Sequence, residues 1–281
     1  MHHARAGTAR FWSMSTNPDA RNPFLAAAID AVLKAGEIQL ARLGTGFRVD
    51  PKGQGDIVTE VDLEVERMFR AMMAQRFPDH GILAEETEES IPAGGAGRRW
   101  LFDPIDGTVN YAHGLPFFCA SLAFEVNGAI ELAAIYDPSR RELFTAERGS
   151  GAWLNSHALH VSRVDRLGDA ALGTGFPHGA VVRVSAMENL LSEYAVRARA
   201  IRRLGSAALD LCYVACGRMD GFWDCNLKPW DIAAGALIVQ EAGGTVTGLD
   251  GGPFSHHSGN VLASNGRLHE EMMSVIRSDP G

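Results

Sequence analysis

Two aspartates that stand three residues apart carry the clearest chemical signal in this sequence. Residues 100–110 read Trp-Leu-Phe-Asp-Pro-Ile-Asp-Gly-Thr-Val-Asn, in which an apolar strand would carry Asp103 to its end, Pro104 would turn the chain, and Asp106 would follow three residues later. Carboxylates this close repel each other unless a cation lies between them, and the carbonyl of Ile105 could add a third hard oxygen ligand. The Gly-Thr pair that follows offers backbone N–H groups to an anion. Asp-Pro and Asp-Gly are also ordinary turn residues, so the segment alone fits a plain turn equally well.

Two further acidic positions support a metal site only in combination with the first. Glu85 and Glu86 follow an apolar run at residues 82–84, and Asp231 stands at the expected start of a helix. More glutamates come soon after Glu86, so a solvated acidic face explains that pair as well. An acidic residue in the first turn of a helix is also favoured by the helix dipole alone. Each segment by itself therefore leaves both interpretations open.

Hydrophobic periodicity predicts the elements that must bring these acids together. Residues 23–44 and 59–77 read as amphipathic helices, and residues 119–146 read as an antiparallel meander with a turn at Asn127-Gly128. Beyond residue 157 strands and helices alternate. We expect strands at 171–174, 221–223 and 261–264, and helices at 184–199, 206–216, 231–242 and the C-terminus.

The chain is expected to fold as an α+β half followed by an α/β half. The first, residues 23–157, would carry the metal-binding motifs, and the second, residues 158–281, would complete the active site. Residues 1–22 are expected to form a disordered N-terminal extension, within which Met14 offers an alternative start. The glycine-rich residues 44–55 are a candidate lid, and Lys52 within them either reaches the site or stays solvated.

Composition excludes several classes of protein. The 281 residues carry 34 acidic and 26 basic side chains, a net charge of −8, with no long basic run. Such a chain repels nucleic acid and anionic lipid, so nucleic acid is disfavoured as a primary ligand. No run approaches the roughly 18 apolar residues that span a membrane, and no signal peptide core is present, so we expect a cytoplasmic protein without a membrane partner. The four cysteines form no Cys-x-x-Cys pair and are expected to be reduced core thiols.

Taken in order, the motifs resemble those of the inositol monophosphatase family, and of its bacterial branch in particular. The matching segments are Asp-Ile-Val-Thr-Glu-Val-Asp at 56–62, Ala-Glu-Glu at 84–86, Asp-Pro-Ile-Asp-Gly-Thr-Val-Asn at 103–110, Trp-Asp-Ile-Ala-Ala-Gly at 230–235, and the glycine segments 243–244 and 251–254. Residues 174–177 and 203–210 resemble the bacterial branch. The resemblance covers residues 24–277 and implies a layered αβαβα sandwich of the inositol monophosphatase and sugar phosphatase type.

The resemblance also implies a Mg²⁺-dependent phosphomonoesterase that uses a metal-activated water, forms no covalent intermediate and is inhibited by lithium. The implied ligands of two or three Mg²⁺ per site are Glu85, Asp103, the carbonyl of Ile105, Asp106 and Asp231. Glu85, Asp62 and Thr108 are the implied catalytic residues, the last two as the pair that orients the water. The backbone of Gly107 and Thr108 matches the phosphate cradle. Independently of the resemblance, an all-oxygen ligand set suits a hard ion such as Mg²⁺, and no His or Cys cluster competes for the role. Of the histidines, His256 and His257 are expected in a loop, and His113 is expected to be structural rather than catalytic.

The substrate is less narrowly defined than the chemistry. Expected substrate contacts are Asp106, Gly107, Thr108, Ser206, Ala207, Asp224 and Asp231. Asp224 stands where family members that act on inositol phosphates carry a glutamate, so a hydroxyl contact is lost or made through water. Ser206 and Ala207 either line the pocket or only permit close helix packing.

The expected substrate is a small polyol monophosphate, foremost myo-inositol 1-phosphate, which would yield inositol and phosphate. Histidinol phosphate, fructose 1,6-bisphosphate and nucleotide 3′-phosphates are alternatives on the same site, since members of this fold differ in their pocket residues. A regulatory binding role without catalysis is a second class of hypothesis. We also expect a homodimer, because the family's fold commonly pairs and the meander offers a flat surface.

Overall fold

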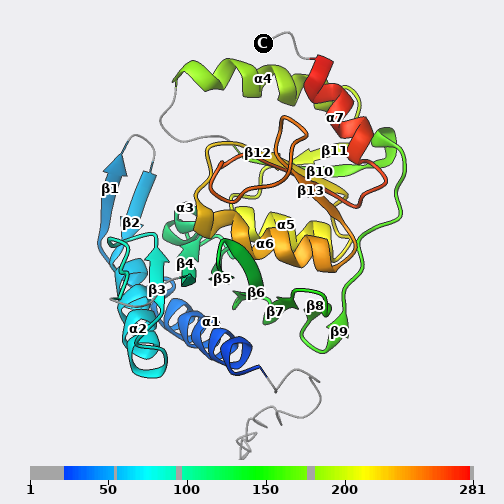
Figure 1. The fold of residues 1–281 in the computed structure, drawn as a ribbon. Coiled ribbons are helices and arrows are strands. Elements are labelled where there is room, and N and C mark those ends of the chain that lie inside the picture. The colour runs from blue at the N-terminus through cyan, green and yellow to red at the C-terminus, as the bar shows by residue number, and fades with distance from the viewer. Residues whose placement is uncertain (1–21, 54–55, 93–96, 176–180, 279–281) are drawn as a thin grey trace, which may run out of the picture.

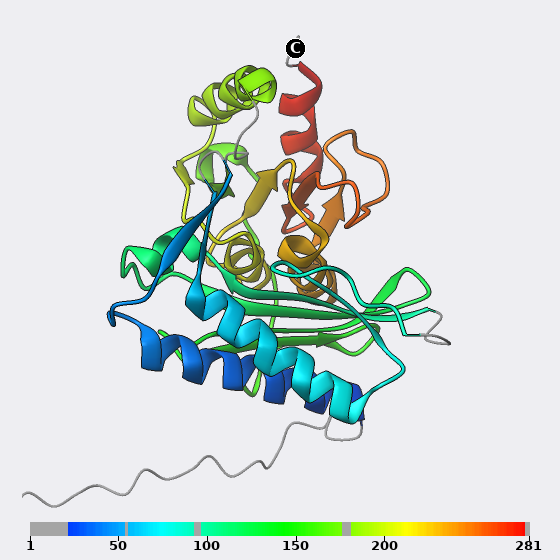
Figure 2. The same ribbon diagram turned by 90° about the vertical axis from the view of Figure 1, so that its left-hand side faces the viewer.

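The computed structural model describes residues 22–53, 56–92, 97–175 and 181–278, and it stacks them in five layers (Figures 1 and 2). Helices α1 (Pro23–Arg42) and α2 (Glu60–Arg76) form one outer layer, against a seven-stranded sheet. Helices α5 (Ala207–Ala215) and α6 (Pro229–Glu241) lie between that sheet and a five-stranded one. Helices α4 (Val181–Ala195) and α7 (His269–Ser278) cover the far face. The αβαβα sandwich expected from the sequence is confirmed.

The seven-stranded sheet contains the predicted meander and one parallel pair. Its strands, in spatial order, are β3 (Gly81–Ala84), β4 (Arg98–Asp106), β5 (Cys119–Val126), β6 (Ala129–Asp137), β7 (Glu142–Glu147), β8 (Gly151–Leu154) and β9 (His157–Ala158). Strands β3 and β4 run parallel and the rest are antiparallel. Asn127 and Gly128 both have positive φ, 51° and 85°, as the tight turn between β5 and β6 requires.

The five-stranded sheet corrects one predicted helix. Its strands, in spatial order, are β11 (Ala200–Arg202), β10 (Ala171–Thr174), β12 (Gly221–Asp224), β14 (Val261–Ser264) and β13 (Thr245–Thr247). The helix predicted over 184–199 ends at Ala195, and β11 follows it as an edge strand parallel to β10. Residues 196–199 form a turn in which the N–H groups of Arg197 and Ala198 both donate to the Tyr194 carbonyl, and this turn ends the helix.

Strand β4 is longer than its sequence predicts, which changes how the two aspartates are presented. We expected the strand to end at Asp103 and Pro104 to turn the chain, but β4 continues to Asp106. Its pairing with β5 is irregular between Asp103 and Asp106, which is where a proline without an N–H is tolerated. The carbonyl of Pro104 accepts a hydrogen bond from the buried amide of Gln39, 2.7 Å away. The aspartates therefore project from a strand anchored by α1.

Short elements complete the fold around one edge of the molecule. A hairpin of β1 (Val49–Gly53) and β2 (Asp56–Thr59) replaces most of the predicted glycine-rich loop, and α3 (Thr108–Ala112) follows β4. A single 3₁₀ turn, Leu167–Asp169, precedes β10. Asn22, predicted as part of the N-terminal extension, caps α1 by accepting a hydrogen bond from the Phe24 N–H; the remainder of that extension, residues 1–21, lies outside the described residues.

Apolar side chains fill the spaces between the layers. One cluster joins α1 and α2 to the seven-stranded sheet, where Phe69 stacks on Phe102 with ring centroids 4.1 Å apart. A second packs α5 and α6 between the sheets, and a third lies under α4 and α7. Within the described ranges, no helix combines the length and apolar character that a membrane crossing needs.

Candidate active site

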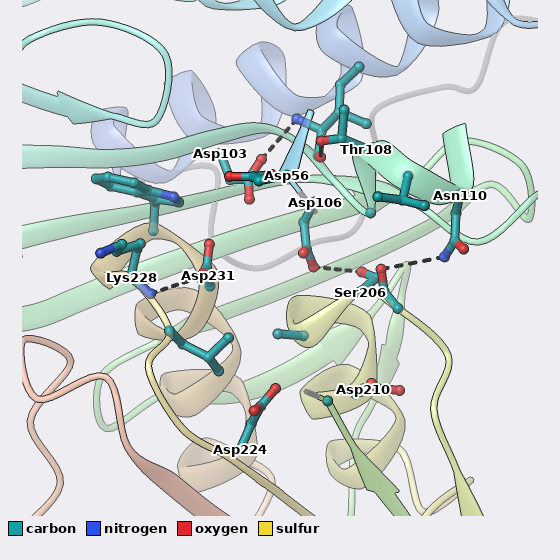
Figure 3. Close-up of a pocket in the computed structure, with 18 of the residues that line it drawn as sticks. Asp56, Asp103, Asp106, Thr108, Asn110, Ser206, Asp210, Asp224, Lys228 and Asp231 are labelled. Atoms are coloured by element: carbon teal, nitrogen blue, oxygen red, sulfur yellow. Dashed lines mark hydrogen bonds between the residues drawn. The ribbon is translucent and has the colours of Figure 1, made fainter. Parts of the chain in front are cut away.

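A pocket of about 650 Å³ opens between the ends of strands β4 and β12, beside the first turns of α5 and α6 (Figure 3). Side chains from β4, α3, the start of α5, the end of β12 and the first turn of α6 line it. Among the sequence-predicted site residues, the lining includes Glu85, Asp103, Ile105, Asp106, Gly107, Thr108, Ser206, Ala207, Asp224 and Asp231. The fold therefore brings together segments up to 146 positions apart in the chain, from Glu85 to Asp231.

Asp106 joins the seven-stranded sheet to the beginning of α5. Its Oδ2 accepts hydrogen bonds from the Ser206 hydroxyl at 2.6 Å and from the Ala208 N–H at 2.7 Å (Figure 3). Ser206 is the N-cap of α5 and also accepts a bond from the Leu209 N–H. A carboxylate at a helix N-terminus is stabilised by the exposed N–H groups and by the helix dipole.

Asp103 and Asp231 each accept a backbone hydrogen bond through one carboxylate oxygen. Asp103 Oδ1 accepts a 2.9 Å hydrogen bond from the Ile105 N–H, and Asp231 Oδ2 accepts one of 2.7 Å from the Lys228 N–H. The second oxygen of each carboxylate accepts no hydrogen bond from any residue that the structure describes. Figure 3 shows both side chains directed into the space that Asp106 also faces. Fixed carboxylates with one unused oxygen are suited to binding a cation.

Asp62 lies behind the pocket wall rather than in it. It caps the first turn of α2 together with Thr59, whose N–H and hydroxyl both donate to Asp62 Oδ2, at 2.8 and 2.5 Å. Its other oxygen lies 3.3 Å from the Thr108 hydroxyl, which is also 2.9 Å from the Ile105 carbonyl oxygen. Asp62 reaches the pocket only through Thr108.

Burial and mutual repulsion make this cluster hard to ionise. Burial raises the pKa of Asp103 and Asp231 well above the usual value, and the charge on Glu85 and Asp106 adds to the shift in both. The pKa of Asp62 and of Asp106 is raised by burial to about 6 each, even though hydrogen bonds to both groups oppose the shift. Cations between these oxygens would relieve the repulsion, and an all-oxygen donor set suits Mg²⁺. The residues present fit the implied metal.

One lysine already supplies part of the missing positive charge. Lys52 of β1 donates to Glu85 Oε1 at 2.9 Å and to Glu86 Oε1 at 2.5 Å. Burial lowers the pKa of Lys52, but the two glutamates outweigh this effect and leave it raised, so the side chain is charged. Of the two predicted alternatives for Lys52, the structure favours the one in which it reaches the site.

The opposite end of the pocket holds two acids whose environment differs from that of the cluster. Asp224 accepts a 2.7 Å hydrogen bond from the Cys225 N–H, and burial raises its pKa to about 7 although the charge of Arg203 opposes the shift. Asp210 of α5 is buried, and its Oδ1 finds no hydrogen-bond partner within the described part of the chain. A Cβ on Gly175 would lie 2.0 Å from Asp224 Oδ2, so a larger residue there would displace the Asp224 carboxylate.

Two glycines let the backbones of the two halves meet beside the cluster. Gly107, the N-cap of α3, has a φ of 100°, and a Cβ on it would lie 2.9 Å from the Phe117 carbonyl oxygen and 3.2 Å from that of Gly205. Gly205 has a φ of 87° and precedes α5. A side chain at Gly107 would be strained and would push α3 away from α5.

Comparison with known proteins decides what kind of protein carries this pocket. The family model described as the inositol monophosphatase family matches residues 20–279. This chain belongs to the inositol monophosphatase family. It is therefore an enzyme, a metal-dependent phosphatase, as the resemblance of its motifs implied.

Named relatives of this inositol monophosphatase family member fall into two groups. It is 40% identical to an inositol-1-monophosphatase of Rhizobium meliloti and 40% identical to the Nus factor SuhB of Salmonella typhimurium. Each alignment covers 92% of this chain and 97% of the relative.

Solved structures give the same result for the fold. The extragenic suppressor protein SuhB of Bartonella henselae superimposes with a TM-score of 0.88 at 39% identity, over 92% of this chain and 99% of that one. An IMPase/NADP phosphatase complexed with Mg²⁺ and phosphate has a TM-score of 0.77 at 28% identity, over 89% of this chain and 93% of that one.

Several pocket residues of this family member were not predicted as site residues from its sequence. They include Asp56, Asn110, Arg203, Asp210, Lys228 and Trp230. Asn110 donates to the carbonyls of Phe117 and Leu204, both at 2.8 Å, and so ties α3 to the segment before α5. Residues 176–177 of the bacterial-branch motif lie outside the described residues. The histidine predicted to be structural, His113, lies 2.8 Å through Nδ1 from the Val109 carbonyl oxygen in α3.

Proposed function

We propose that this enzyme is a Mg²⁺-dependent phosphomonoesterase for a small polyol monophosphate, foremost myo-inositol 1-phosphate. One observation carries the proposal: fixed carboxylates with unused oxygens face the same space beside the backbone of Gly107 and Thr108. Such a site attracts cations first and then an anion that bridges them to N–H donors. A phosphate ester meets both requirements.

We assign the metal ligands to the residues predicted from the sequence. They are Glu85, Asp103, the carbonyl of Ile105, Asp106 and Asp231, for two or three Mg²⁺. When bound, Mg²⁺ would offset phosphate charge and lower the pKa of a coordinated water. Lithium would compete for the same oxygens and inhibit.

Thr108 and Asp62 would orient the attacking water. A hydroxyl has one proton and two lone pairs. With the proton of Thr108 directed to Asp62 Oδ1, 3.3 Å away, the lone pairs of the hydroxyl oxygen remain free to accept a hydrogen bond from a water in the pocket. The two bonds from Thr59 hold Asp62 in place for this role. No side chain of the site needs to form a covalent intermediate.

The substrate's hydroxyls would meet Ala207 and Asp224, whereas Ser206 has a second task. The Ser206 hydroxyl donates to Asp106, so its proton is not available to a substrate. We therefore propose that Ser206 positions Asp106, while Ala207 leaves room for a polyol ring. The carboxyl of Asp224 would form a hydrogen bond with a ring hydroxyl of the substrate, directly or through a water molecule.

A substrate panel tests the proposal. Purified protein with Mg²⁺ is given myo-inositol 1-phosphate, histidinol phosphate, fructose 1,6-bisphosphate and a nucleotide 3′-phosphate, and kcat/KM is compared. We expect the highest value for inositol 1-phosphate and inhibition by Li⁺. If the enzyme releases phosphate from none of these compounds, the proposal is refuted. If kcat/KM is higher for another compound of the panel, that compound replaces inositol 1-phosphate as the proposed substrate and the proposed reaction is unchanged.

A regulatory role is the second candidate, because relatives 40% identical to this chain are named Nus factor SuhB. A protein partner is then expected, since the net charge of −8 opposes direct contact with nucleic acid. A pull-down with the Asp106→Asn variant separates this role from catalysis: a stoichiometric partner retained by an inactive variant supports it.

We further propose that the enzyme works in the cytoplasm as a homodimer. The expectation rests on the antiparallel meander, which forms strands β5 to β7. Light scattering should give twice the 30.2 kDa of one chain. A mass equal to one chain would exclude the dimer.

A further inference from the structure

A cluster of two histidines and a glutamate lies away from the pocket, at the other end of β5. Cys119 at the start of β5 contacts Asp106 at the pocket, and Glu125 lies six residues further along, about 20 Å for an extended strand. His256 and His257 belong to the connection between β13 and β14. His256 Nε2 lies 2.9 Å from Glu125 Oε2, and His257 Nε2 lies 3.9 Å from the same oxygen.

We propose that Glu125, His256 and His257 form a second metal site, which binds Zn²⁺. Each residue offers one ligand atom, and these atoms all lie within 4.8 Å of one another. Ligands placed about 2.0–2.1 Å from a tetrahedral zinc are roughly 3.3 Å apart, and the two measured distances fall on either side of that value. A shift of the half-exposed His257 side chain toward Glu125 would complete the geometry.

The donor set distinguishes this site from the pocket. Imidazole nitrogen suits Zn²⁺, whereas the carboxylate and carbonyl oxygens of the pocket suit Mg²⁺. His257 is half exposed, with 52% of its side-chain surface accessible, so a water can occupy the fourth position. The same chain would therefore hold two kinds of metal at two places, with the imidazole site preferring Zn²⁺ and the pocket filled by Mg²⁺ in excess.

The protonation states around the cluster are those that a metal needs. Burial lowers the pKa of His256, so its ring is neutral near pH 7. Burial raises the pKa of Glu125, but the hydrogen bonds from Arg99 and His256 outweigh it and leave a lowered value, so the group is a carboxylate. The ion would take the place of the Nε2 proton that now lies between His256 and Glu125, and the neutral His256 ring would carry its one proton on Nδ1 instead.

Arg99 is the positive group that faces the cluster. One of its terminal nitrogens lies 3.0 Å from both oxygens of Glu125 and 3.4 Å from His257 Nε2. The other terminal nitrogen donates to Glu89 at 2.7 Å, so Arg99 keeps a carboxylate partner when the zinc takes its place beside Glu125. Its charge weakens the site but does not block it.

Zinc at this position would fasten the β13–β14 connection to the seven-stranded sheet. The connection continues to Gly259, whose carbonyl accepts a hydrogen bond from the Leu227 N–H at 2.9 Å. A Cβ at this position would lie 2.5 Å from the Leu227 carbonyl oxygen, so the two backbones are in close contact. Leu227 precedes Lys228, whose backbone N–H donates a hydrogen bond to Asp231 Oδ2. The site would thus brace the segment that enters α6 without touching substrate.

Calorimetry with Zn²⁺ alone as the titrant tests the site in the full chain, with Mg²⁺ in large excess to fill the pocket. His257→Gln is expected to weaken Zn²⁺ binding at least tenfold. His157→Gln, at the exposed end of β9, is the matched control and should bind as the original chain does. Phosphatase activity with Mg²⁺ should be the same in all three proteins.

Crystals soaked in zinc provide the second measurement. We expect an anomalous peak at the zinc edge between His256 Nε2, His257 Nε2 and Glu125. Equal Zn²⁺ affinity in the His257→Gln variant, or a peak confined to the pocket or to the N-terminal histidines, would overturn the proposal.

Discussion

Lys52 Nζ lies 2.9 Å from Glu85 Oε1, so a lysine of the β1–β2 hairpin is paired with a proposed metal ligand. Both side chains are about four-fifths buried, since 22% and 19% of their surfaces remain accessible. The Lys52 ammonium group therefore offsets part of the negative charge of the site, which a bound metal ion would otherwise offset.

Replacing Lys52 by glutamine should strengthen Mg²⁺ binding. A partly exposed ion pair contributes roughly 0.5–1 kcal/mol, so we expect the Mg²⁺ concentration for half-maximal activity to fall about two- to fivefold. Lys34→Gln on α1 is the control. A higher Mg²⁺ requirement in the Lys52 variant would mean that the lysine assists binding instead of competing with it.

The Asp106→Asn substitution should remove the negative charge at this position and keep its hydrogen bonds. The asparagine oxygen can still accept from Ser206 and Ala208, so α5 keeps its cap, while one negative charge is lost. We expect kcat/KM to fall by at least about 10³-fold, equivalent to roughly 4 kcal/mol. The metal-free melting temperature should stay equal or rise, because repulsion is reduced. Asp79→Asn, at an exposed position after α2, should change neither quantity, and an active Asp106→Asn enzyme would contradict the proposed role.

Thr108→Val should reduce turnover without preventing substrate binding. Valine has the shape of threonine but no hydroxyl, so the water would lose its orienting partner and kcat should fall about 10²-fold with KM little changed. Thr108→Ser keeps the hydroxyl and should recover most of the activity. If Val and Ser variants are equally impaired, Thr108 acts through packing.

Magnesium should stabilise the protein more at high pH than at low pH. The pKa of Asp62 and of Asp106 is about 6 in the folded chain against 3.8 for an ordinary aspartate, so the folded state binds more protons than the unfolded one between about pH 4 and 6. Their contribution to the free energy of unfolding therefore decreases as pH rises through that window. Melting curves at pH 5 and pH 8, with and without Mg²⁺, should show the larger Mg²⁺-induced shift at pH 8. The same shift at both values would contradict this explanation.

Sequence reasoning located the site because its residues stand in short local motifs. Asp103, Asp106 and Asp231 are recognisable from their neighbours, and the helices and strands that present them have strong periodicity. The error in β4 arose from Pro104, which ends most strands but is accommodated here by an irregular pairing with β5.

The remaining features depend on contacts between distant parts of the chain. Lys52 meets Glu85 across 33 positions, and His256 meets Glu125 across 131. No local pattern encodes such a pair, because each partner has an ordinary sequence environment. The predicted assignment of His256 to a loop agrees with the structure, yet it gave no indication that the side chain is buried beside a glutamate.

The link from Asp106 to the start of α5 also has a practical consequence. Because the pocket is built from both sheets, a molecule that occupies it adds contacts between them and must raise the melting temperature by an amount that grows with the logarithm of its concentration relative to its dissociation constant. A fluorescence melt in the presence of Mg²⁺ can therefore rank phosphate esters as ligands before any assay of turnover exists, and an inactive Asp106→Asn protein should not be used for that ranking.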